Sequence, residues 1–221
     1  MGQWLLRLKF EQDKRFHYKM TNRTSQSSKA EDGSNTGTPQ EQAVEVLLEQ
    51  RILRVDGDGT GHVTSISTPQ IPGGEKMRTV VYQQLGGRGD TLQASSPHQG
   101  NAFSFPEEPV EVGSTWTGTT QTQLPNVPNP ITMNYGYKVE GEEALGARHC
   151  IKISFSSDEV KFSVPLPDGS GVTQVTTRTE GLMHFDPNDG CLAKLDLTSW
   201  TTPRMGKVAF EVVNRSEQVL L

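Results

Sequence analysis

The chain has 221 residues, a net charge of -5, 33% hydrophobic residues and a mean hydropathy of -0.55. This length fits a single all-β domain spanning residues 1–221, because single β-domains often reach this size. Charges of both signs are interspersed and there is no basic run, which excludes nucleic acid as a partner. No apolar run approaches the length of about 18 residues that a transmembrane segment needs.

The location of the protein is not fixed by the sequence. The opening "MGQWLLRLKF" has an apolar stretch too short for a secretory signal, so the chain as written is expected to be soluble. If a signal has been removed or missed, the expected location is extracytoplasmic, in the cell envelope.

Apolar and polar residues alternate with a period of two along much of the chain, which predicts strands with one buried face. Two strands are predicted first, at 6–10 and at 16–20. Later strands are predicted at 44–48, 79–83, 115–122, 131–139, 148–155, 160–164, 171–185, 191–200 and 207–213.

Between these strands lies the polar stretch "TSQSSKAEDGSNTGTPQEQ", which runs from Thr24 to Gln42. Its one possible apolar anchor is a single alanine, so it cannot offset the entropy lost on ordering. We therefore predict a mobile polar loop at about 24–42, inside the domain.

Turn chemistry separates the predicted strands. "RVDGDGTGHVTSI" places Asp and Gly between two alternating runs, which is typical of a β-hairpin. In "FPEEPVEVGSTW", Pro106 and Pro109 cannot donate to a ladder and so lie outside any central strand. We interpret this stretch as a chain crossing, after which Trp116 begins the next strand and packs at the sheet edge.

Together these signals predict an all-β fold with about ten or more antiparallel strands. The sheet is expected to be long and strongly curved, as a half-barrel or a barrel-like structure, with little helix.

Two short motifs resemble known binding motifs, but neither matches the full pattern that binding requires. "DGDGTG" opens like a calcium loop, but Thr60 and Ser67 occupy positions where further oxygen ligands are needed, so a turn is favoured. "RGD" at 88–90 lies in a glycine-rich loop and is too short to indicate receptor recognition. The sequence therefore predicts no cofactor and no calcium site.

The five histidines show no metal-ligand spacing, and each is predicted to be an exposed strand residue. These residues are His17, His62, His98, His149 and His184.

The two cysteines, Cys150 and Cys191, fall on opposite faces by alternation, which argues against a disulfide. A bulge at Gly190 would change that parity and leave a disulfide open. Neither cysteine has a base beside it in the sequence, and no serine-nucleophile motif is present. The chain is accordingly predicted to have no catalytic residue and to be no enzyme.

Three phrases indicate a family resemblance: "PVEVGSTW", "YGYKVEGEEALGARHCIKI" and "GLMHFDPNDGCLAKL". Their order, over about 105–200, resembles uncharacterised bacterial β-rich envelope domains and the curved sheets of the LolA and LppX lipid carriers. The resemblance implies an exported, lipoprotein-like bacterial protein that carries a lipid.

The alternation predicts one apolar concave face, which is a core by default and a ligand groove if the sheet stays half open. Its possible ligand-binding residues are Leu8, Phe10, Tyr18, Val46, Tyr135, Tyr137, Ile151, Ile153, Phe162 and Leu195.

Three functions follow, from different classes. The first is a non-catalytic envelope protein that binds a lipid or another apolar ligand on the concave face. The alternative is a structural or interaction module that meets a protein partner through Trp4, Trp116 or Trp200. The third is an enzyme, which would need His184 and Asp186 to join another histidine in space.

Overall fold

The computed structural model describes residues 2–29, 38–71, 73, 77–95, 103–124, 127, 129–166, 171–206 and 208–221, which form twelve strands and no helix. The strands are β1 (Arg15–Lys29), β2 (Gln40–Val55), β3 (Gly61–Gln70), β4 (Thr79–Leu85), β5 (Thr91–Ala94), β6 (Thr115–Thr122), β7 (Ile131–Leu145), β8 (Arg148–Ser157), β9 (Val160–Pro165), β10 (Val172–Asp186), β11 (Cys191–Met205) and β12 (Val208–Leu220). The predicted all-β class is confirmed. In the described part of the chain, no helix is long and apolar enough to cross a membrane.

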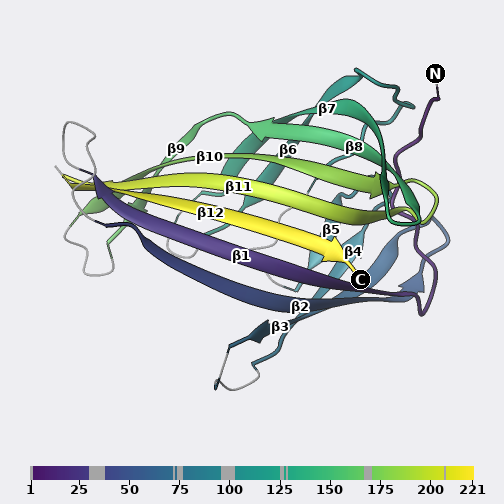
Figure 1. The fold of residues 1–221 in the computed structure, drawn as a ribbon, viewed down its shortest axis with the longest axis horizontal. Helices are drawn as coiled ribbons and strands as arrows, with labels where there is room; N and C mark the ends of the chain where they lie inside the picture. Colours follow the sequence, from purple (N-terminus) through teal and green to yellow (C-terminus); the bar gives the residue numbers. More distant parts are fainter. Residues whose placement is uncertain are drawn as a thin grey trace.

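All twelve strands belong to one antiparallel sheet, in the order β5-β4-β3-β2-β1-β12-β11-β10-β8-β7-β6 (Figure 1). The first strand, β1, pairs with the last strand, β12, so the two halves of the chain join at the middle of the sheet. β9 pairs with β10 beyond the end of β8. Among the described residues the strand order ends at β5 and β6, and the curved, barrel-like sheet remains open between them.

The period-two alternation produces two distinct faces. The inner face carries the apolar residues of the long strands, such as Tyr18 on β1 and Met183 on β10, which are 3% and 1% exposed. The outer face carries the residues between them, such as the exposed His17 and Lys19. The inner face corresponds to the concave face predicted from the sequence.

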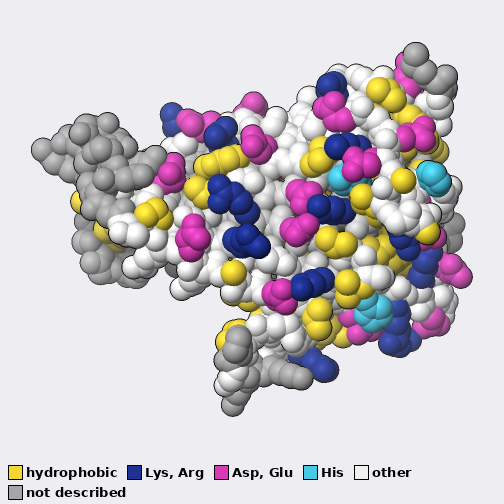
Figure 2. Space-filling view, in the orientation of Figure 1, with side chains coloured by type: hydrophobic (Ala, Val, Ile, Leu, Met, Phe, Trp, Pro, Cys, Tyr) yellow, Lys and Arg dark blue, Asp and Glu magenta, His cyan; other side chains and the backbone are white. Residues whose placement is uncertain are grey.

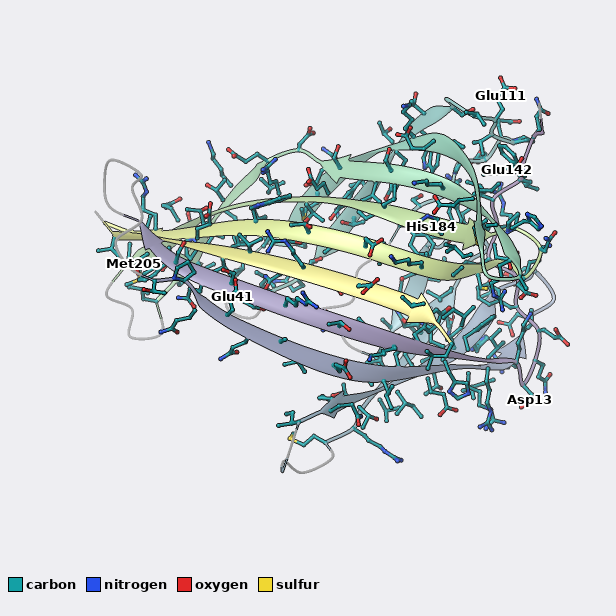
Figure 3. The ribbon with its side chains drawn as sticks, viewed as in Figure 1. Asp13, Glu41, Glu111, Glu142, His184 and Met205 are labelled. Carbon is teal, nitrogen blue, oxygen red and sulfur yellow. The ribbon has the colours of Figure 1, made fainter. Side chains whose placement is uncertain are left out.

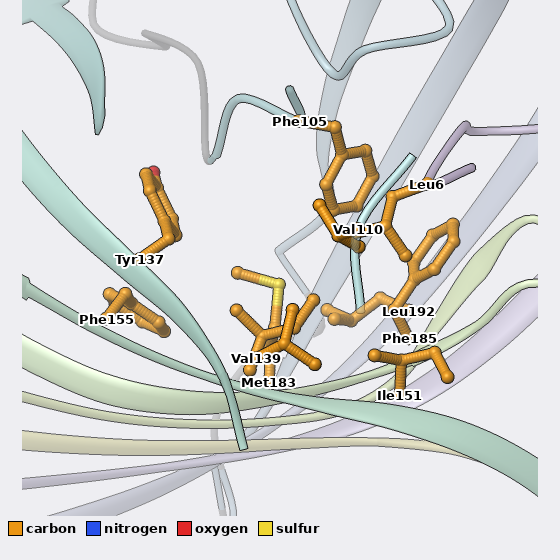
Figure 4. Packing of buried hydrophobic residues seen from close by; sticks show 11 residues of the cluster. Leu6, Phe105, Val110, Tyr137, Val139, Ile151, Phe155, Met183, Phe185 and Leu192 are labelled. Carbon is orange, nitrogen blue, oxygen red and sulfur yellow. The ribbon is translucent and has the colours of Figure 1, made fainter. Parts of the chain in front are cut away.

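The hydrophobic core is a cluster of buried side chains that pack against one another (Figure 4). Phe105 and Phe185 are fully buried and meet edge to face, with their ring centroids 4.7 Å apart. Gly181 leaves room for Phe155, because a Cβ there would lie 2.4 Å from the Phe155 ring. The cluster consists of Leu6, Phe105, Val110, Tyr137, Val139, Ile151, Ile153, Phe155, Met183, Phe185 and Leu192.

The segment 103–113 crosses the open side of the sheet between β5 and β6. Pro106 and Pro109 lie outside the strands, as predicted. Trp116 lies in β6, stacks on Tyr137 with ring centroids 5.1 Å apart, and donates its indole N–H to the Ser104 carbonyl over 2.7 Å. The stretch "FPEEPVEVGSTW" therefore delivers Phe105 to the core and anchors Trp116 beside it.

The strand predicted at 6–10 is wrong. Leu8 and Lys9 donate their backbone N–H groups to Gly87 and Gly190, which belong to two different turns, so no ladder with one partner strand forms. The segment instead enters the mouth of the barrel-like sheet, where Leu6 is fully buried. The alternation at 6–10 correctly predicted that one face of the segment is buried. It could not predict the hydrogen-bond partners of the backbone.

The boundaries of the predicted mobile loop at 24–42 are also wrong. Residues 24–29 continue β1 and residues 40–42 begin β2, in register with each other, while residues 30–37 lie outside the described residues. This polar stretch forms sheet because its backbone groups are paired. Residues 24–26 pair with both β2 and β12, and residues 27–29 pair with β12.

Tyr137 is expected to weaken the fold at alkaline pH. Burial raises the pKa of Tyr137 to about 12, whereas an unfolded tyrosine titrates near about 10. Because the folded pKa lies above the unfolded value, the protonated Tyr137 hydroxyl contributes to the stability of the fold. That contribution is complete below about pH 10 and is lost as the pH rises to about 12. Urea unfolding across this range should show a smaller loss for Tyr137→Phe than for the wild type. An equal loss in both proteins would contradict this assignment.

Candidate functional site

A cavity of about 180 Å³ lies between the inner face and the segments that cover the mouth. Strands β1, β2, β3, β4, β11 and β12 form its floor, with Phe16, Ile52, Val63 and Leu195 among its apolar walls. Leu8, Phe10 and Phe103 close it from the covering segments.

Backbone hydrogen bonds hold the cover in place. Leu8 donates its N–H to Gly87 over 2.7 Å, and Lys9 donates its N–H to Gly190 over 3.0 Å. Phe10 lies directly on the backbone of Gly61, where a Cβ would come within 2.4 Å of the ring. The cover is therefore tied to the turns at the ends of β4 and β10 and packed on β3.

Three polar side chains line this cavity without a hydrogen bond to any described residue: Tyr18, Gln83 and Gln218. Tyr18 is 3% exposed, and its burial raises the pKa of its hydroxyl, which therefore stays protonated. Gln83 and Gln218 are half-buried, so their amides face the cavity and are not sealed in the core. The cavity thus combines apolar walls with unused donors and acceptors.

Both cysteines are free thiols and both are buried, which confirms that they are not bonded. Cys191 lines the cavity, and burial raises the pKa of its thiol to about 12. Burial also raises the pKa of Cys150, which is fully buried although alternation places it on the polar face. A thiol with a raised pKa is a weak nucleophile near neutral pH.

The structure divides the ten predicted ligand-face residues. Leu8, Phe10, Tyr18 and Leu195 line the cavity. Tyr137, Ile151 and Ile153 belong to the packed core, and Tyr135 packs against it. Val46, on β2, and Phe162, on β9, line neither the cavity nor the core cluster.

Sequence reasoning missed the polar part of the site. Gln50, Gln83 and Gln218 point to the inner face, but a search for apolar positions passes over them. Their position could have been inferred from the alternation, because residues two apart on a strand share a face. Gln50 lies two residues before the buried Ile52, and Gln218 lies two residues before Leu220. What parity could not show is that the cover leaves space above them.

A second cluster lies on the outer face around His62, which was predicted to be exposed and is 4% exposed. His62 Nε2 lies 2.7 Å from Asp56 Oδ2, and its Nδ1 bonds to the Tyr82 hydroxyl. Arg54 also contacts Asp56, at 3.2 Å. The neutral ring can donate to Asp56 and accept from Tyr82. This network holds the β2–β3 hairpin.

The predicted exposure of His184, which lies on β10 (Figure 3), is also wrong, since this residue is 3% exposed. Its Nε2 lies 3.4 Å from Glu143 Oε2, and neither ring nitrogen has a hydrogen bond. Asp186 is engaged by Arg148 at 2.8 Å instead. His184 and Asp186 are therefore not joined, and within the described residues no three His, Cys, Asp or Glu side chains are placed to hold a metal ion.

The other histidine predictions have separate outcomes. His17 and His149 are exposed, as predicted, and His98 lies outside the described residues.

Fold and cavity together define an all-β protein with one open, curved antiparallel sheet and a small covered chamber. No family model and no curated protein matches the chain. Among solved structures it matches the crystal structure of Ail, the attachment invasion locus protein of Yersinia pestis, at 8% identity and a TM-score of 0.23. That alignment covers 96% of this chain and 100% of Ail. The TM-score is too low for the likeness to carry an argument about function.

The resemblance to LolA and LppX lipid carriers is not supported and is withdrawn. No family model matches the chain, and the solved structure reported above is Ail, not a carrier of that type. The lipoprotein-like character and the lipid partner implied by that resemblance fall with it.

The protein partner that was expected to meet Trp4, Trp116 or Trp200 is not supported either, because all three residues make contacts within the chain. The backbone of Trp4 forms a β-bridge with Val110, and the Trp116 ring stacks on Tyr137. The Arg178 guanidinium lies over the Trp200 ring at 4.2 Å.

Proposed function

We propose that the protein binds one small molecule in the covered cavity, a compound with a ring-sized apolar body and a hydrogen-bonding end. The observation that carries this proposal is the cavity of about 180 Å³ whose lining includes the unpartnered Tyr18, Gln83 and Gln218.

Cavity size sets the size of the ligand. An engineered apolar cavity of about 150 Å³ takes up benzene, whereas sites for drug-sized ligands measure roughly 300–1,000 Å³. The cavity here, at about 180 Å³, is close to the first value. A single six-membered ring with one or two substituents fits it, and a long acyl chain does not.

The lining sets the polarity of the ligand. Phe10, Phe16 and Leu195 offer apolar contact to a ring. The Tyr18 hydroxyl donates one hydrogen bond and accepts others, and each glutamine amide does both. A ligand that pairs with these groups is favoured over a hydrocarbon of the same shape, because the hydrocarbon leaves them unpaired.

The proposed role is binding without catalysis. The two reactive groups at the cavity are Cys191, whose pKa is raised to about 12, and Lys9, whose Nζ donates to the Asn188 carbonyl over 3.0 Å. The thiol is protonated near neutral pH, and the ammonium is held away by its own hydrogen bond. This arrangement supplies neither a base nor a nucleophile to a bound molecule.

Phenol and benzene are the probes that test this proposal, with binding followed by NMR chemical shifts of the cavity residues. Leu195→Phe is expected to fill part of the cavity and to weaken binding of both probes by about ten-fold or more, since steric overlap replaces contact. Tyr18→Phe is expected to weaken phenol by about ten-fold while leaving benzene nearly unchanged, because one hydrogen bond is lost.

Leu47→Phe, at an exposed position on the outer face of β2, is the matched control and should leave both affinities unchanged. Failure of the wild type to bind either probe would overturn the proposal. So would equal weakening by the substitutions at Leu47 and Leu195.

The envelope location expected from the sequence stays a prediction. Fractionation of the native host, with detection of the protein in periplasmic, membrane and cytosolic fractions, tests it directly.

A further inference from the structure

The outer face of the central strands carries charge in cross-strand rows. One row holds Lys152, Lys194 and Lys19, on β8, β11 and β1. The next row holds Asp196, Glu217 and Glu45. The third row holds Glu180, Arg215 and Arg23, on β10, β12 and β1. Basic and acidic side chains accordingly lie next to one another over this face (Figure 2).

The first two rows neutralise each other. Lys194 contacts Asp196 at 3.1 Å and Glu217 at 3.0 Å. Lys19 contacts Glu45 at 2.7 Å. The carboxylates of the second row are therefore already engaged by lysines.

The third row is not neutralised. Arg23 on β1 lies directly opposite Arg215 on β12, and both side chains are exposed. Neither guanidinium has an ion pair or hydrogen bond with a described residue. Like charges directly opposite each other on neighbouring strands destabilise a sheet. Glu180 shares this row, but it lies on β10, and Thr198 of β11 stands between it and Arg215.

A second arginine pair in the same protein shows the contrast. Arg15 and Arg51 also lie directly opposite each other, on β1 and β2. Each of them has a carboxylate: Arg15 contacts Glu49 at 3.4 Å, and Arg51 contacts Asp13 at 2.7 Å. The chain therefore supplies counter-charges to one arginine pair and leaves the other without them.

The unneutralised pair faces a groove of about 330 Å³ on the outer surface. Thr21 and Thr198 also line this groove, so hydroxyl donors lie along its walls beside the two guanidinium groups. Asp196 and Glu217 also line the groove, but Lys194 holds both. These five charged groups together leave one net positive charge.

We propose that Arg23 and Arg215 form a binding site for a phosphate or sulfate group. Guanidinium groups present paired N–H donors that match the oxygens of such anions, and two of them face the same groove here. Thr21 and Thr198 supply further donors to the remaining oxygens. This site lies on the opposite face of the sheet from the cavity, so its ligand is independent of the one proposed there.

Titration with inorganic phosphate, inorganic sulfate and glucose 6-phosphate tests this site. Binding is followed by NMR of the arginine Nε–Hε signals at low ionic strength, because salt screens exposed charges. Arg23→Gln and Arg215→Gln are each expected to weaken binding of all three probes by about ten-fold, since each removes one charged donor group.

Arg15→Gln, on the neutralised pair, is the matched control and should leave the affinities unchanged. Without ligand, Arg23→Gln should unfold at the same urea concentration as the wild type or a higher one, because the substitution removes a like-charge repulsion. Tighter binding of glucose 6-phosphate than of phosphate would support a phosphate carried on a larger molecule, and equal binding a free anion. No binding of any probe by the wild type, or an equal loss in Arg15→Gln, would overturn the proposal.

Discussion

Phe105→Ala is expected to lower the free energy of unfolding by about 3–5 kcal/mol, the cost of removing a large aromatic side chain from a packed core. Phe105 is fully buried and meets Phe185 edge to face at 4.7 Å. Phe105 belongs to the crossing segment 103–113. Its backbone N–H donates to the Arg88 carbonyl, and its carbonyl accepts from the Arg88 side chain. The substitution therefore removes both core volume and the residue that docks the crossing.

Urea unfolding followed by tryptophan fluorescence measures this effect, because Trp116 stacks beside the affected cluster. Val112→Ala is the control on the same segment, since Val112 is 47% exposed. Its cost should stay within about 0.5 kcal/mol, as is usual for surface positions. A small effect of Phe105→Ala would mean that the crossing segment is not part of the core.

Asp186→Ala is expected to cost about 3 kcal/mol, because it removes a buried carboxylate that serves three donors. Asp186 Oδ2 accepts from Arg148 over 2.8 Å. Its Oδ1 accepts the backbone N–H of Asn188 over 2.9 Å and that of Asp189 over 3.2 Å. These bonds shape the turn between β10 and β11, next to the Gly190 carbonyl that anchors the cover of the cavity.

Asp186→Asn separates charge from shape. The amide oxygen still accepts the two backbone N–H groups, and Arg148 keeps its contact with Asp189 at 2.5 Å, so a cost of about 1 kcal/mol is expected. Asp58→Ala is the control, because Asp58 accepts a similar turn N–H from Thr60 but its carboxylate is exposed, so this substitution should cost clearly less than Asp186→Ala. Equal effects of Asp186→Ala and Asp58→Ala in urea unfolding would contradict the role assigned to Asp186.

The strands were predictable where one face of the sheet is buried and the other is exposed, because apolar and polar residues then alternate in the sequence. In β8, the alternation of Cys150 to Phe155 identifies the residues that reach the core, and in β10 that of Met183 and Phe185 does the same. Turn residues located the hairpins, since Gly59 and Gly190 both adopt the positive φ that those turns require. Neither signal needs a distant part of the chain.

The errors share one cause, which is that distant contacts decide the outcome. The segment 6–10 alternates like a strand, yet its backbone bonds to two turns, at Gly87 and Gly190. The polar residues 24–29 lack apolar anchors, yet β12 pairs with all of them and β2 pairs with residues 24–26. His62 was predicted to be exposed because nothing near it in sequence shows that Tyr82 covers it.

By itself, the sequence determined the all-β class, the approximate positions of most strands, the hairpin turns and the apolar parity of the inner face, because these depend on residues a few positions apart. Only the tertiary structure decided which inner residues pack into the core and which surround a cavity, since that depends on where the N-terminal segment and the crossing segment come to lie. It also decided that Arg23 meets Arg215, which is 192 positions away in the chain, without a counter-charge. Both candidate sites arise from such long-range contacts, and local patterns in the sequence do not encode them.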